Sequence, residues 1–278
     1  MQFVVDQAQL AVELAPLHAA GRVALVATMG ALHGGHLALI REARERADVV
    51  VVSIYVNPRQ FGAGEDYHRY PRSLEQDREL CADMGVELLF APDSLYRDGG
   101  ARLSMVVDAS LSGCLCGAGR PGHFDGVATV VAILFNLVRP DVALFGEKDW
   151  QQLQVIRALV EDLLFPVEII GVATRRERSG LAMSSRNLNL TSGGLVRAAR
   201  IHTVLSAMRK RAEQGERMVV HLEAAAMREL AQDGIRVEYL QVRHEQSLCL
   251  VDEVSAGCRI FIAAYIDGVR LIDNMPLL

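Results

Sequence analysis

The stretch Asp48–Val56 constrains the fold of this 278-residue chain more than any other segment. It reads Asp-Val-Val-Val-Val-Ser-Ile-Tyr-Val, so β-branched and aromatic residues fill nearly every position. A strand with one face in water alternates between apolar and polar residues, whereas a strand covered on both faces is apolar throughout. We therefore expect a central strand of a parallel sheet, with helices packed on both of its faces.

Apolar runs alternate with amphipathic segments through the first 170 residues. The expected strands are Arg22–Ala27, 48–56, Val86–Phe90, Asp141–Phe145 and Val167–Ile170, and the expected helices are 36–46, 73–84, 125–138 and 149–163. This alternation predicts an α/β fold, a doubly wound parallel sheet with right-handed crossovers. In such sheets ligands bind beyond the carboxyl ends of the strands.

The pattern changes after residue 175. The expected elements there are helices at Leu195–Glu213 and His221–Asp233, followed by strands at Arg236–Val242, Arg259–Ala264 and Val269–Asp273. The last two strands are separated by Asp267-Gly268, a dipeptide typical of tight hairpins. Helices followed by antiparallel strands predict a separate, smaller α+β domain. We expect two domains, residues 1–175 and 176–278.

Composition excludes several classes of protein. Hydrophobic residues make up 51% of the chain and charged residues 23%, which is typical of a globular protein. The net charge of −5 argues against an extended nucleic-acid-binding surface, and no apolar run approaches the roughly 20 residues of a membrane span. The five cysteines are irregularly spaced, which fits a reducing compartment. We expect a cytoplasmic protein with neither nucleic acid nor membrane as a partner.

The segment Thr28–His36, Thr-Met-Gly-Ala-Leu-His-Gly-Gly-His, follows an expected strand and leads into an expected helix. Backbone N–H groups converge on an anion at such a turn, and its glycines let a ligand approach the backbone closely. Because His33 and His36 add ring donors, this segment predicts a site for nucleotide phosphates. Two alternatives remain: the histidines only shape the turn and cap the helix, or they bind a metal, although no nearby group completes a four-ligand set.

Two further polar motifs also follow expected strands. Asn57-Pro58-Arg59-Gln60 follows the central strand, and Gly146-Glu147-Lys148-Asp149 follows the strand 141–145, with Gln152 one turn beyond Lys148. A Gln amide carries both donors and an acceptor, which suits a substrate with hydroxyl and carboxylate groups. A lysine at a strand end neutralises phosphate charge. Each motif in isolation is also compatible with a solvated loop.

Met183-Ser184-Ser185-Arg186-Asn187 combines two hydroxyls with a guanidinium, a combination that suits phosphate oxygens. The segment 117–122, Gly-Ala-Gly-Arg-Pro-Gly, has the glycine spacing of a dinucleotide-binding loop. We reject that interpretation, because no apolar strand precedes the segment and Pro121 interrupts it. No Gly-x-x-x-x-Gly-Lys-Ser/Thr motif occurs, which excludes a P-loop ATPase.

Taken in order, these motifs resemble the pantoate–β-alanine ligase (pantothenate synthetase) family. The resemblance covers about residues 20–190 and rests on Thr28–His36, Ser53–Phe61, Arg120–Phe124, Phe145–Asp149, Gln151-Gln152 and Gly180–Asn187. The His-x-x-His and Met-Ser-Ser-Arg elements also resemble the ATP motifs of class I aminoacyl-tRNA synthetases and related nucleotidylyltransferases. The chain departs from the family pattern at Cys116, Gly119, Ile133, Ala173 and Arg175.

The resemblance implies a Rossmann-like sheet of the nucleotidylyltransferase type, with the smaller α+β domain covering the active site. It implies an ATP-dependent condensation of (R)-pantoate with β-alanine, which gives pantothenate, AMP and diphosphate through a pantoyl adenylate. ATP, Mg²⁺ and a homodimeric assembly are implied with it. A nucleotidylyltransferase of the same fold that acts on another small acceptor is the alternative, and a nucleotide- or metal-binding protein without turnover is a more distant one.

The resemblance also assigns roles to particular residues. The assigned catalytic residues are His33, His36, Lys148 and Arg186. The residues assigned to ATP are Met29, Gly30, Ala31, Leu32, His33, Gly34, Gly35, His36, Gly146, Glu147, Lys148, Asp149, Arg175, Met183, Ser184, Ser185 and Arg186. Gln60 and Gln152 are assigned to pantoate, and no residue is assigned as a metal ligand. The segment 175–187 is expected to close over ATP.

Overall fold

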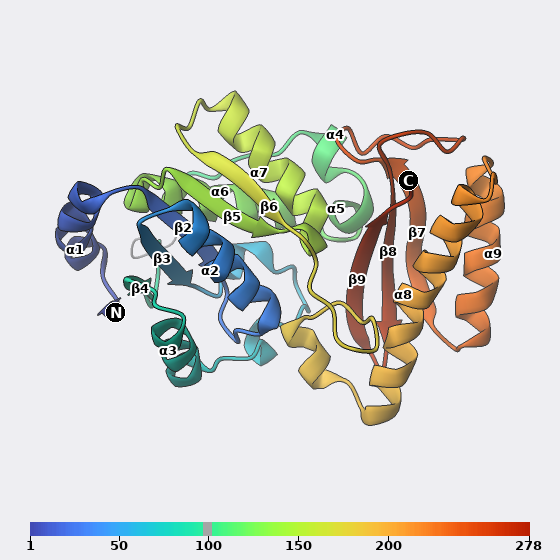
Figure 1. The fold of residues 1–278 in the computed structure, drawn as a ribbon, viewed down its shortest axis with the longest axis horizontal. Coiled ribbons are helices and arrows are strands. Elements are labelled where there is room, and N and C mark those ends of the chain that lie inside the picture. The colour runs from blue at the N-terminus through green and yellow to red at the C-terminus, as the bar shows by residue number, and fades with distance from the viewer. Residues whose placement is uncertain (97–101) are drawn as a thin grey trace. The chain divides into compact units, whose positions relative to one another are not determined.

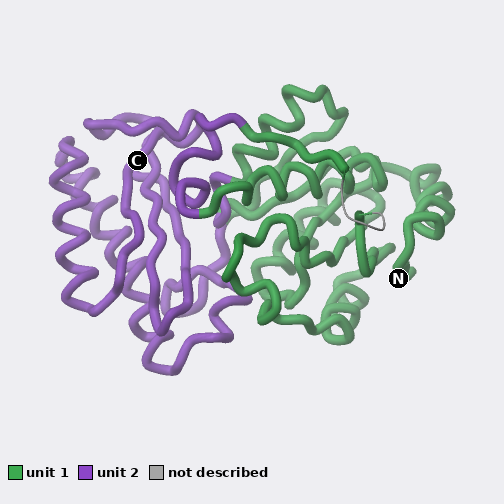
Figure 2. Tube along the Cα trace, turned by 180° about the vertical axis from the view of Figure 1, so that it is seen from behind, with its two compact units in different colours: residues 1–107, 120–147, 152–173 green, residues 108–119, 148–151, 174–278 purple. Residues whose placement is uncertain are grey.

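The computed structural model describes residues 1–96 and 102–278 (Figure 1). The chain forms two compact units, which Figure 2 shows in different colours. Unit 1 comprises residues 1–107, 120–147 and 152–173, and unit 2 comprises residues 108–119, 148–151 and 174–278. Each unit is therefore built from segments that are separate in the sequence.

Unit 1 contains a six-stranded sheet whose neighbouring strands are all parallel. Its strands are β1 (Gln2–Val4), β2 (Val23–Thr28), β3 (Val49–Ile54), β4 (Leu88–Phe90), β5 (Val142–Gly146) and β6 (Glu168–Val172). They lie in the order β1-β4-β3-β2-β5-β6, so the direction of winding reverses between β2 and β5. The expected doubly wound parallel sheet is confirmed, and β3, the strand of the valine run, is central and buried.

Helices cover both faces of this sheet (Figure 1). They are α1 (Gln7–Ala20), α2 (Gly34–Arg46), α3 (Leu74–Asp83), α6 (His123–Val138) and α7 (Trp150–Asp162). Leu39 and Ile40 of α2 and Cys81 of α3 pack in one core cluster with residues of β2, β3, β4 and β5. Helices α1 and α6 contact each other and the strands β3 and β2, respectively.

Unit 2 contains a three-stranded antiparallel sheet in the order β7-β8-β9. Its elements are α8 (Ser192–Glu213), α9 (Val219–Gln232), β7 (Arg236–His244), β8 (Cys258–Ile266), β9 (Val269–Pro276), α4 (Ala109–Ser112) and α5 (Leu115–Gly119). Helices α8 and α9 pack against each other and share a core cluster with the sheet. The expected hairpin is confirmed: Asp267 and Gly268 have φ of 52° and 78°, the left-handed conformation that a two-residue turn requires.

Two N-terminal elements, β1 and α1, have no counterpart among the elements that the sequence predicts. β1 is only three residues long and pairs with β4 at the edge of the sheet. Helix α1 contains Pro16 in its interior and exposes Val12 while burying Leu10 and Leu14, so its apolar residues do not form a single stripe. Both elements escape a search for helical or strand periodicity.

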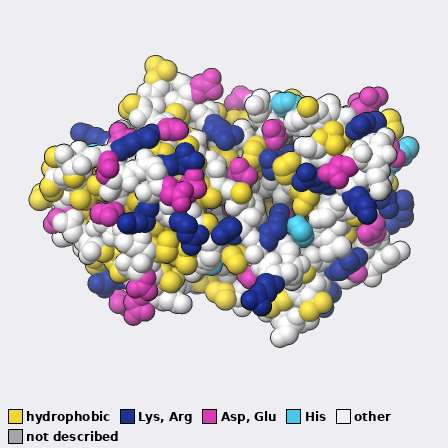
Figure 3. All heavy atoms as spheres, in the orientation of Figure 1, with side chains coloured by type: hydrophobic (Ala, Val, Ile, Leu, Met, Phe, Trp, Pro, Cys, Tyr) yellow, Lys and Arg dark blue, Asp and Glu magenta, His cyan; other side chains and the backbone are white. Residues whose placement is uncertain are grey.

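The short 3-10 helices lie in the loops that follow strands. They are η1 (Pro58–Gln60), η2 (Tyr67–Arg69), η3 (Glu147–Asp149) and η4 (Ser185–Asn189). On the face drawn in Figure 3, basic and acidic side chains are intermingled. Within the part of the chain that the structure describes, none of the helices combines the length and the apolar character needed to cross a membrane.

Candidate active site

The buried carboxylate of Asp77 accepts hydrogen bonds from the backbone of the loop between β2 and α2. Gly30 and Ala31 adopt left-handed conformations, with φ of 80° and 50°. Asp77 of α3, whose exposed fraction is 1%, accepts the backbone N–H groups of Ala31 at 2.9 Å and Leu32 at 2.8 Å. This carboxylate therefore determines the path of the loop, although nothing in the sequence around residue 77 distinguishes it from the exposed acidic residues of the same helix.

The two histidines of this loop cap helix α2. The ring Nδ1 of His33 accepts the N–H of Gly35 at 3.1 Å, and the ring Nδ1 of His36 accepts the N–H of His33 at 3.3 Å. Their ring centroids are 4.1 Å apart. Since a neutral imidazole with an accepting Nδ1 carries its proton on Nε2, both rings are oriented to offer an Nε2–H donor. Each ring can therefore cap the helix with one nitrogen and donate to a ligand with the other. The interpretation that the histidines shape the turn and cap the helix is thus compatible with a phosphate site.

The loop after β3 contacts the loop after β2 through Gln60. The side-chain Nε2 of Gln60 donates to the sulfur of Met29 at 3.1 Å, and its Oε1 accepts from Asn57 at 3.1 Å. Asn57 is buried and also donates to the carbonyl of Gly126 in α6. The structure thus brings together Met29, assigned to ATP, and Gln60, assigned to pantoate.

The loop after β5 begins beside the loop after β2. Val26 of β2 pairs with Leu144 of β5, so Thr28 and Gly146 end neighbouring parallel strands at the same edge of the sheet. Glu147 starts the 3-10 helix η3, and Gln152 is the third residue of α7. Gly146, Glu147 and Gln152 belong to unit 1, together with Met29–His36 and Gln60.

The remaining assigned residues belong to unit 2. Lys148 lies in η3, where its Nζ is 3.9 Å from Asp149 and its carbonyl accepts from Asn274 of β9 at 2.9 Å. The following residues are anchored in the same unit: Trp150 donates to the carbonyl of Glu245 at 2.6 Å. Gln151, which the resemblance includes, is buried and bonds the backbone of residues 111–116, so its role is to hold that segment.

The serine–arginine motif follows a short hairpin. Backbone bonds join Glu177 to Leu181 and Met183 to Arg175, and Ser184 caps η4 by accepting the N–H of Arg186 at 3.3 Å. Ser185 is buried.

This hairpin is fastened to strand β9 by an ion pair. Arg176 donates to both oxygens of Asp273, at 2.6 and 3.0 Å, and also donates to the carbonyl of Gly180. Arg176 therefore anchors the start of the segment 175–187 to β9. No role for Arg176 is expected from the sequence.

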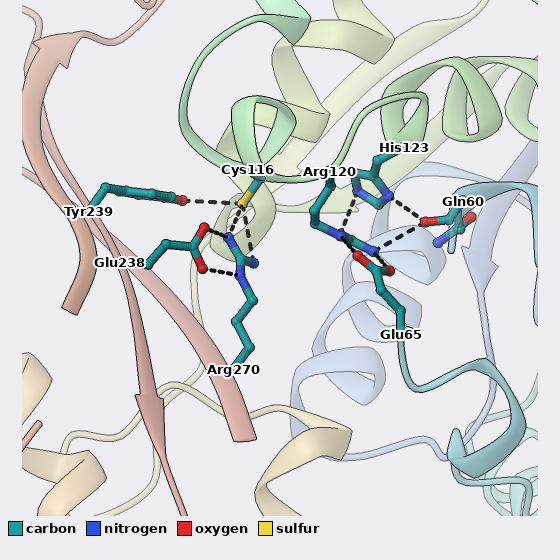
Figure 4. Close-up of polar contacts among 8 residues, drawn as sticks. All are labelled: Gln60, Glu65, Cys116, Arg120, His123, Glu238, Tyr239 and Arg270. Atoms are coloured by element: carbon teal, nitrogen blue, oxygen red, sulfur yellow. Dashed lines mark hydrogen bonds and ion pairs between the residues drawn. The ribbon is translucent and has the colours of Figure 1, made fainter. Parts of the chain in front are cut away.

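A polar cluster in unit 2 contains one of the departures from the family pattern (Figure 4). The Cys116 sulfur lies 3.2 Å from the Tyr239 hydroxyl and 3.7 Å from two guanidinium nitrogens of Arg270. Arg270 also binds Glu238 through two contacts of 2.8 and 2.9 Å. Burial and the neighbouring Cys116 raise the pKa of Tyr239, so this hydroxyl stays protonated. The cluster joins α5 to the three-stranded sheet.

Among the described residues, no three or more His, Cys, Asp or Glu side chains are grouped in a way that could hold a metal ion.

A doubly wound parallel sheet with polar loops at the carboxyl ends of the strands beside its switch point is the architecture of a nucleotide-binding α/β protein. Comparisons with known proteins narrow this class. The profile of the pantoate–β-alanine ligase family matches residues 2–276. The chain belongs to this family, and as a pantoate–β-alanine ligase it forms pantothenate.

Individual relatives agree along nearly the whole chain. The pantothenate synthetase of Pseudomonas fluorescens (strain Pf0-1) is 48% identical over 258 residues, which cover 92% of this chain and 90% of the relative. A crystal structure of pantothenate synthetase from Thermus thermophilus superimposes with a TM-score of 0.94 at 46% identity, covering 100% of this chain and 99% of the other. The pantoate–β-alanine ligase of Francisella tularensis, crystallised in complex with "Beta-gamma ATP" and β-alanine, gives a TM-score of 0.85 at 35% identity, covering 100% and 98%.

These comparisons confirm the expected family, the fold class and the ligase activity. They favour the ligase over the alternative of a nucleotidylyltransferase that acts on another acceptor.

Proposed function

We propose that the ligation proceeds in two steps through a pantoyl adenylate. The carboxylate of (R)-pantoate attacks the α-phosphorus of ATP and releases diphosphate, and the amine of β-alanine then attacks the activated carbonyl and releases AMP. A carboxylate is nucleophilic without a base, so the first step needs alignment of the reactants and stabilisation of phosphate charge. The assigned residues offer these functions, because they are mainly donors and cations rather than bases.

The observation that carries this proposal is the ring orientation of His33 and His36. Each Nδ1 accepts a backbone N–H, so each ring carries its proton on Nε2, and the helix cap fixes the position of that donor before ATP binds. Donors that need no reorganisation stabilise developing charge best. We assign these two donors, together with Lys148, Ser184, Ser185 and Arg186, to the phosphates of ATP. The other residues assigned to ATP are Met29–Leu32, Gly34, Gly35, Gly146, Glu147, Asp149, Arg175 and Met183.

We assign pantoate to Gln60 and Gln152. Gln60 is 8% exposed, and its amide is oriented by Asn57 and Met29. A Gln amide offers both donors and an acceptor to hydroxyl and carboxylate groups. These amides favour an acceptor with hydroxyl and carboxylate groups over a phosphorylated one, which would call for Arg or Lys.

We propose that Mg²⁺ binds to this protein as its complex with ATP. The described residues hold no cluster of three or more acidic, histidine or cysteine ligands, so the ion would be held mainly by phosphate oxygens. Glu147 and Asp149 are the carboxylates among the residues that we assign to ATP. Mg²⁺ commonly binds in this way in phosphate chemistry. When bound, it supplies further neutralisation of phosphate charge.

We also propose a homodimer, and that the C-terminal domain closes over the active site; both rest on the resemblance to the family. A cytoplasmic location is supported by the free thiols of all five cysteines. Light scattering after size-exclusion chromatography tests the dimer, since a particle of one chain mass would contradict it.

An oxygen-transfer experiment tests the two-step mechanism. Pantoate labelled with ¹⁸O in its carboxylate should transfer one labelled oxygen to AMP, because the bond from that oxygen to phosphorus survives when the amide forms. Diphosphate release should require pantoate but should not depend on β-alanine, whereas AMP release should require both substrates. Unlabelled AMP, or ADP as the product, would contradict the adenylate.

A further inference from the structure

Arg120 occupies the centre of a polar cluster in unit 1 (Figure 4). Its guanidinium binds both oxygens of Glu65 at 2.6 Å. The Nη1 atom of the same group lies 3.0 Å from the Nε2 of His123, and Nη2 donates to the backbone carbonyl of Gln60 at 3.1 Å. These contacts connect Arg120 to a residue that we assign to pantoate.

The ion pair in this cluster is largely shielded from water. The side chains of Arg120 and Glu65 are 13% and 25% exposed. Burial alone raises the pKa of Glu65, but the hydrogen bond and charge of Arg120 more than offset it, so the pKa lies below its usual value. Two charge-assisted contacts of this geometry hold the guanidinium in one orientation. The partners are thus ionised at neutral pH.

The same geometry determines the proton position on His123. Arginine can only donate, so the Nε2 of His123 accepts from Arg120, and its Nδ1 carries the proton. That Nδ1 lies 2.7 Å from the carbonyl oxygen of Gln60 and donates to it. The carbonyl of Gln60 therefore receives two donors, one from Arg120 and one from His123.

The opposite end of Gln60 is also held. Its side-chain amide contacts Asn57 and Met29. Helix α6 approaches the same turn so closely that a Cβ on Gly126 would lie 2.3 Å from the carbonyl oxygen of Arg59. This turn therefore has little room in which to relax if the hydrogen bonds to its backbone are lost.

We infer that Glu65, Arg120 and His123 are positioning residues for Gln60, and that through it they set the affinity for pantoate. This inference rests on the proposed role of Gln60. Arg120 contacts the backbone of Gln60 directly, at 3.1 Å, and Glu65 holds the guanidinium in the orientation that this contact needs. A loss of this pair shifts the amide of Gln60 and weakens the binding of pantoate without a direct effect on ATP.

The test compares Michaelis constants for the two substrates. Glu65→Gln keeps the shape of the side chain but removes the charge that orients Arg120, and it should raise the pantoate KM about tenfold, leaving the ATP KM within about twofold. The control is Glu213→Gln, which breaks an exposed pair with Arg209 and should change neither constant. A purely structural role of the cluster would instead lower kcat with both KM values unchanged, and that result would overturn the inference.

A double-mutant cycle identifies the route of the effect. Gln60→Ala should raise the pantoate KM by itself, and adding Glu65→Gln to it should cause no further rise. Independent, multiplicative effects of the two substitutions would overturn the inference and leave the role of Gln60 intact. An unchanged pantoate KM in Gln60→Ala would refute the assignment of Gln60 and the inference with it. If Glu65→Gln does not fold, Arg120→Lys, which retains the positive charge but gives up the two-pronged contact, replaces it in the same cycle.

Discussion

The residues of the loop after β2 combine two tasks in the same side chain. His33 and His36 each accept a backbone N–H at the start of α2 with the ring Nδ1, and each ring carries its proton on Nε2, the atom that we assign to a ligand. A substitution at either position therefore changes a helix cap as well as a donor. The two effects can be separated by the choice of replacement.

At His36 we expect the donor to matter more than the cap. His36→Ala removes both and should raise the barrier to adenylate formation by about 2–4 kcal/mol, roughly a 30- to 1,000-fold loss of rate. His36→Gln retains a side-chain acceptor three residues after the N-cap and should restore the stability of the helix but not the rate. Pantoate-dependent diphosphate release and chemical denaturation measure these outcomes. Stoichiometric zinc in the purified protein, absent from His36→Ala, would instead favour the metal interpretation.

Asp77 should matter to ATP binding without contacting ATP. In Asp77→Asn an NH₂ group replaces one oxygen that accepts from Ala31 or Leu32, so two donors face each other in a buried place. We expect the free energy of unfolding to fall by about 1–3 kcal/mol and the ATP KM to rise, while the β-alanine KM changes little. Glu75→Gln, on the exposed side of the same helix, is the control. A loss of stability with an unchanged ATP KM would show that the loop tolerates the change.

The sequence identifies which residue types carry the chemistry but not which residues support them. Histidines, glutamines and serines at strand ends stand out because their neighbours form recognisable motifs. Asp77, Glu65 and Arg176 act through contacts with segments 45 to 97 residues away in the chain, and no local pattern reports such contacts. Their burial is a product of the fold.

At the scale of elements, the hairpin before the serine–arginine motif is the segment that we expect to respond to nucleotide. It has its own backbone bonds and an anchor, Arg176–Asp273, and it leads into the short 3-10 helix η4, which contains two residues that we assign to the phosphates, Ser185 and Arg186. Hydrogen exchange across residues 175–190 should therefore slow on binding of ATP or the adenylate, because contacts with phosphates order this part of the chain. Equal protection with and without nucleotide would make the segment a static part of the site.

Elements with strong periodicity were predictable, and those without it were not. Strands β2 to β9 and helices α2, α3, α6, α7, α8 and α9 lie within a few residues of their expected ranges. The start of α2 was wrong by two residues, since Gly34 and Gly35 are helical and His33 is the cap. Strand β1 and helix α1 were missed because pairing with β4 and packing against α6, rather than local pattern, stabilise them.

For the molecule as a whole, we expect His202 of α8 to make the free energy of unfolding depend on pH. Burial and the charge of Arg176 lower its pKa from the usual value of 6.5, so the folded protein binds fewer protons than the unfolded chain. The contribution of this residue is complete above pH 6.5 and is lost as the pH falls through the lowered pKa. We expect the free energy of unfolding to decrease from about pH 7 to about pH 5, and His202→Gln to reduce that slope.

Urea denaturation at several pH values measures the slope. His68→Gln, at an exposed position of unit 1, is the control and should leave it unchanged. A slope that is the same in His202→Gln as in the original chain would assign the dependence to other groups.

The fold class could be predicted because alternating strands and helices leave few ways to build a sheet. The composition of the two units could not. Residues 108–119 and 148–151 lie within the stretch that reads as one parallel α/β domain, yet they belong to unit 2. Their assignment follows from contacts such as those of Gln151 and Trp150, which only the folded chain reveals.

This interleaving matters for recombination between relatives. A crossover near residue 174 would join Trp150 and Gln151 of one parent to the C-terminal sheet of another, across contacts such as that of Trp150 with the carbonyl of Glu245. At about half identity, the two parents need not match there. Chimeric enzymes should retain their fold most often when residues 108–119, 148–151 and 174–278 all come from the same parent. The unit that recombination has to keep intact therefore consists of three pieces of sequence rather than one.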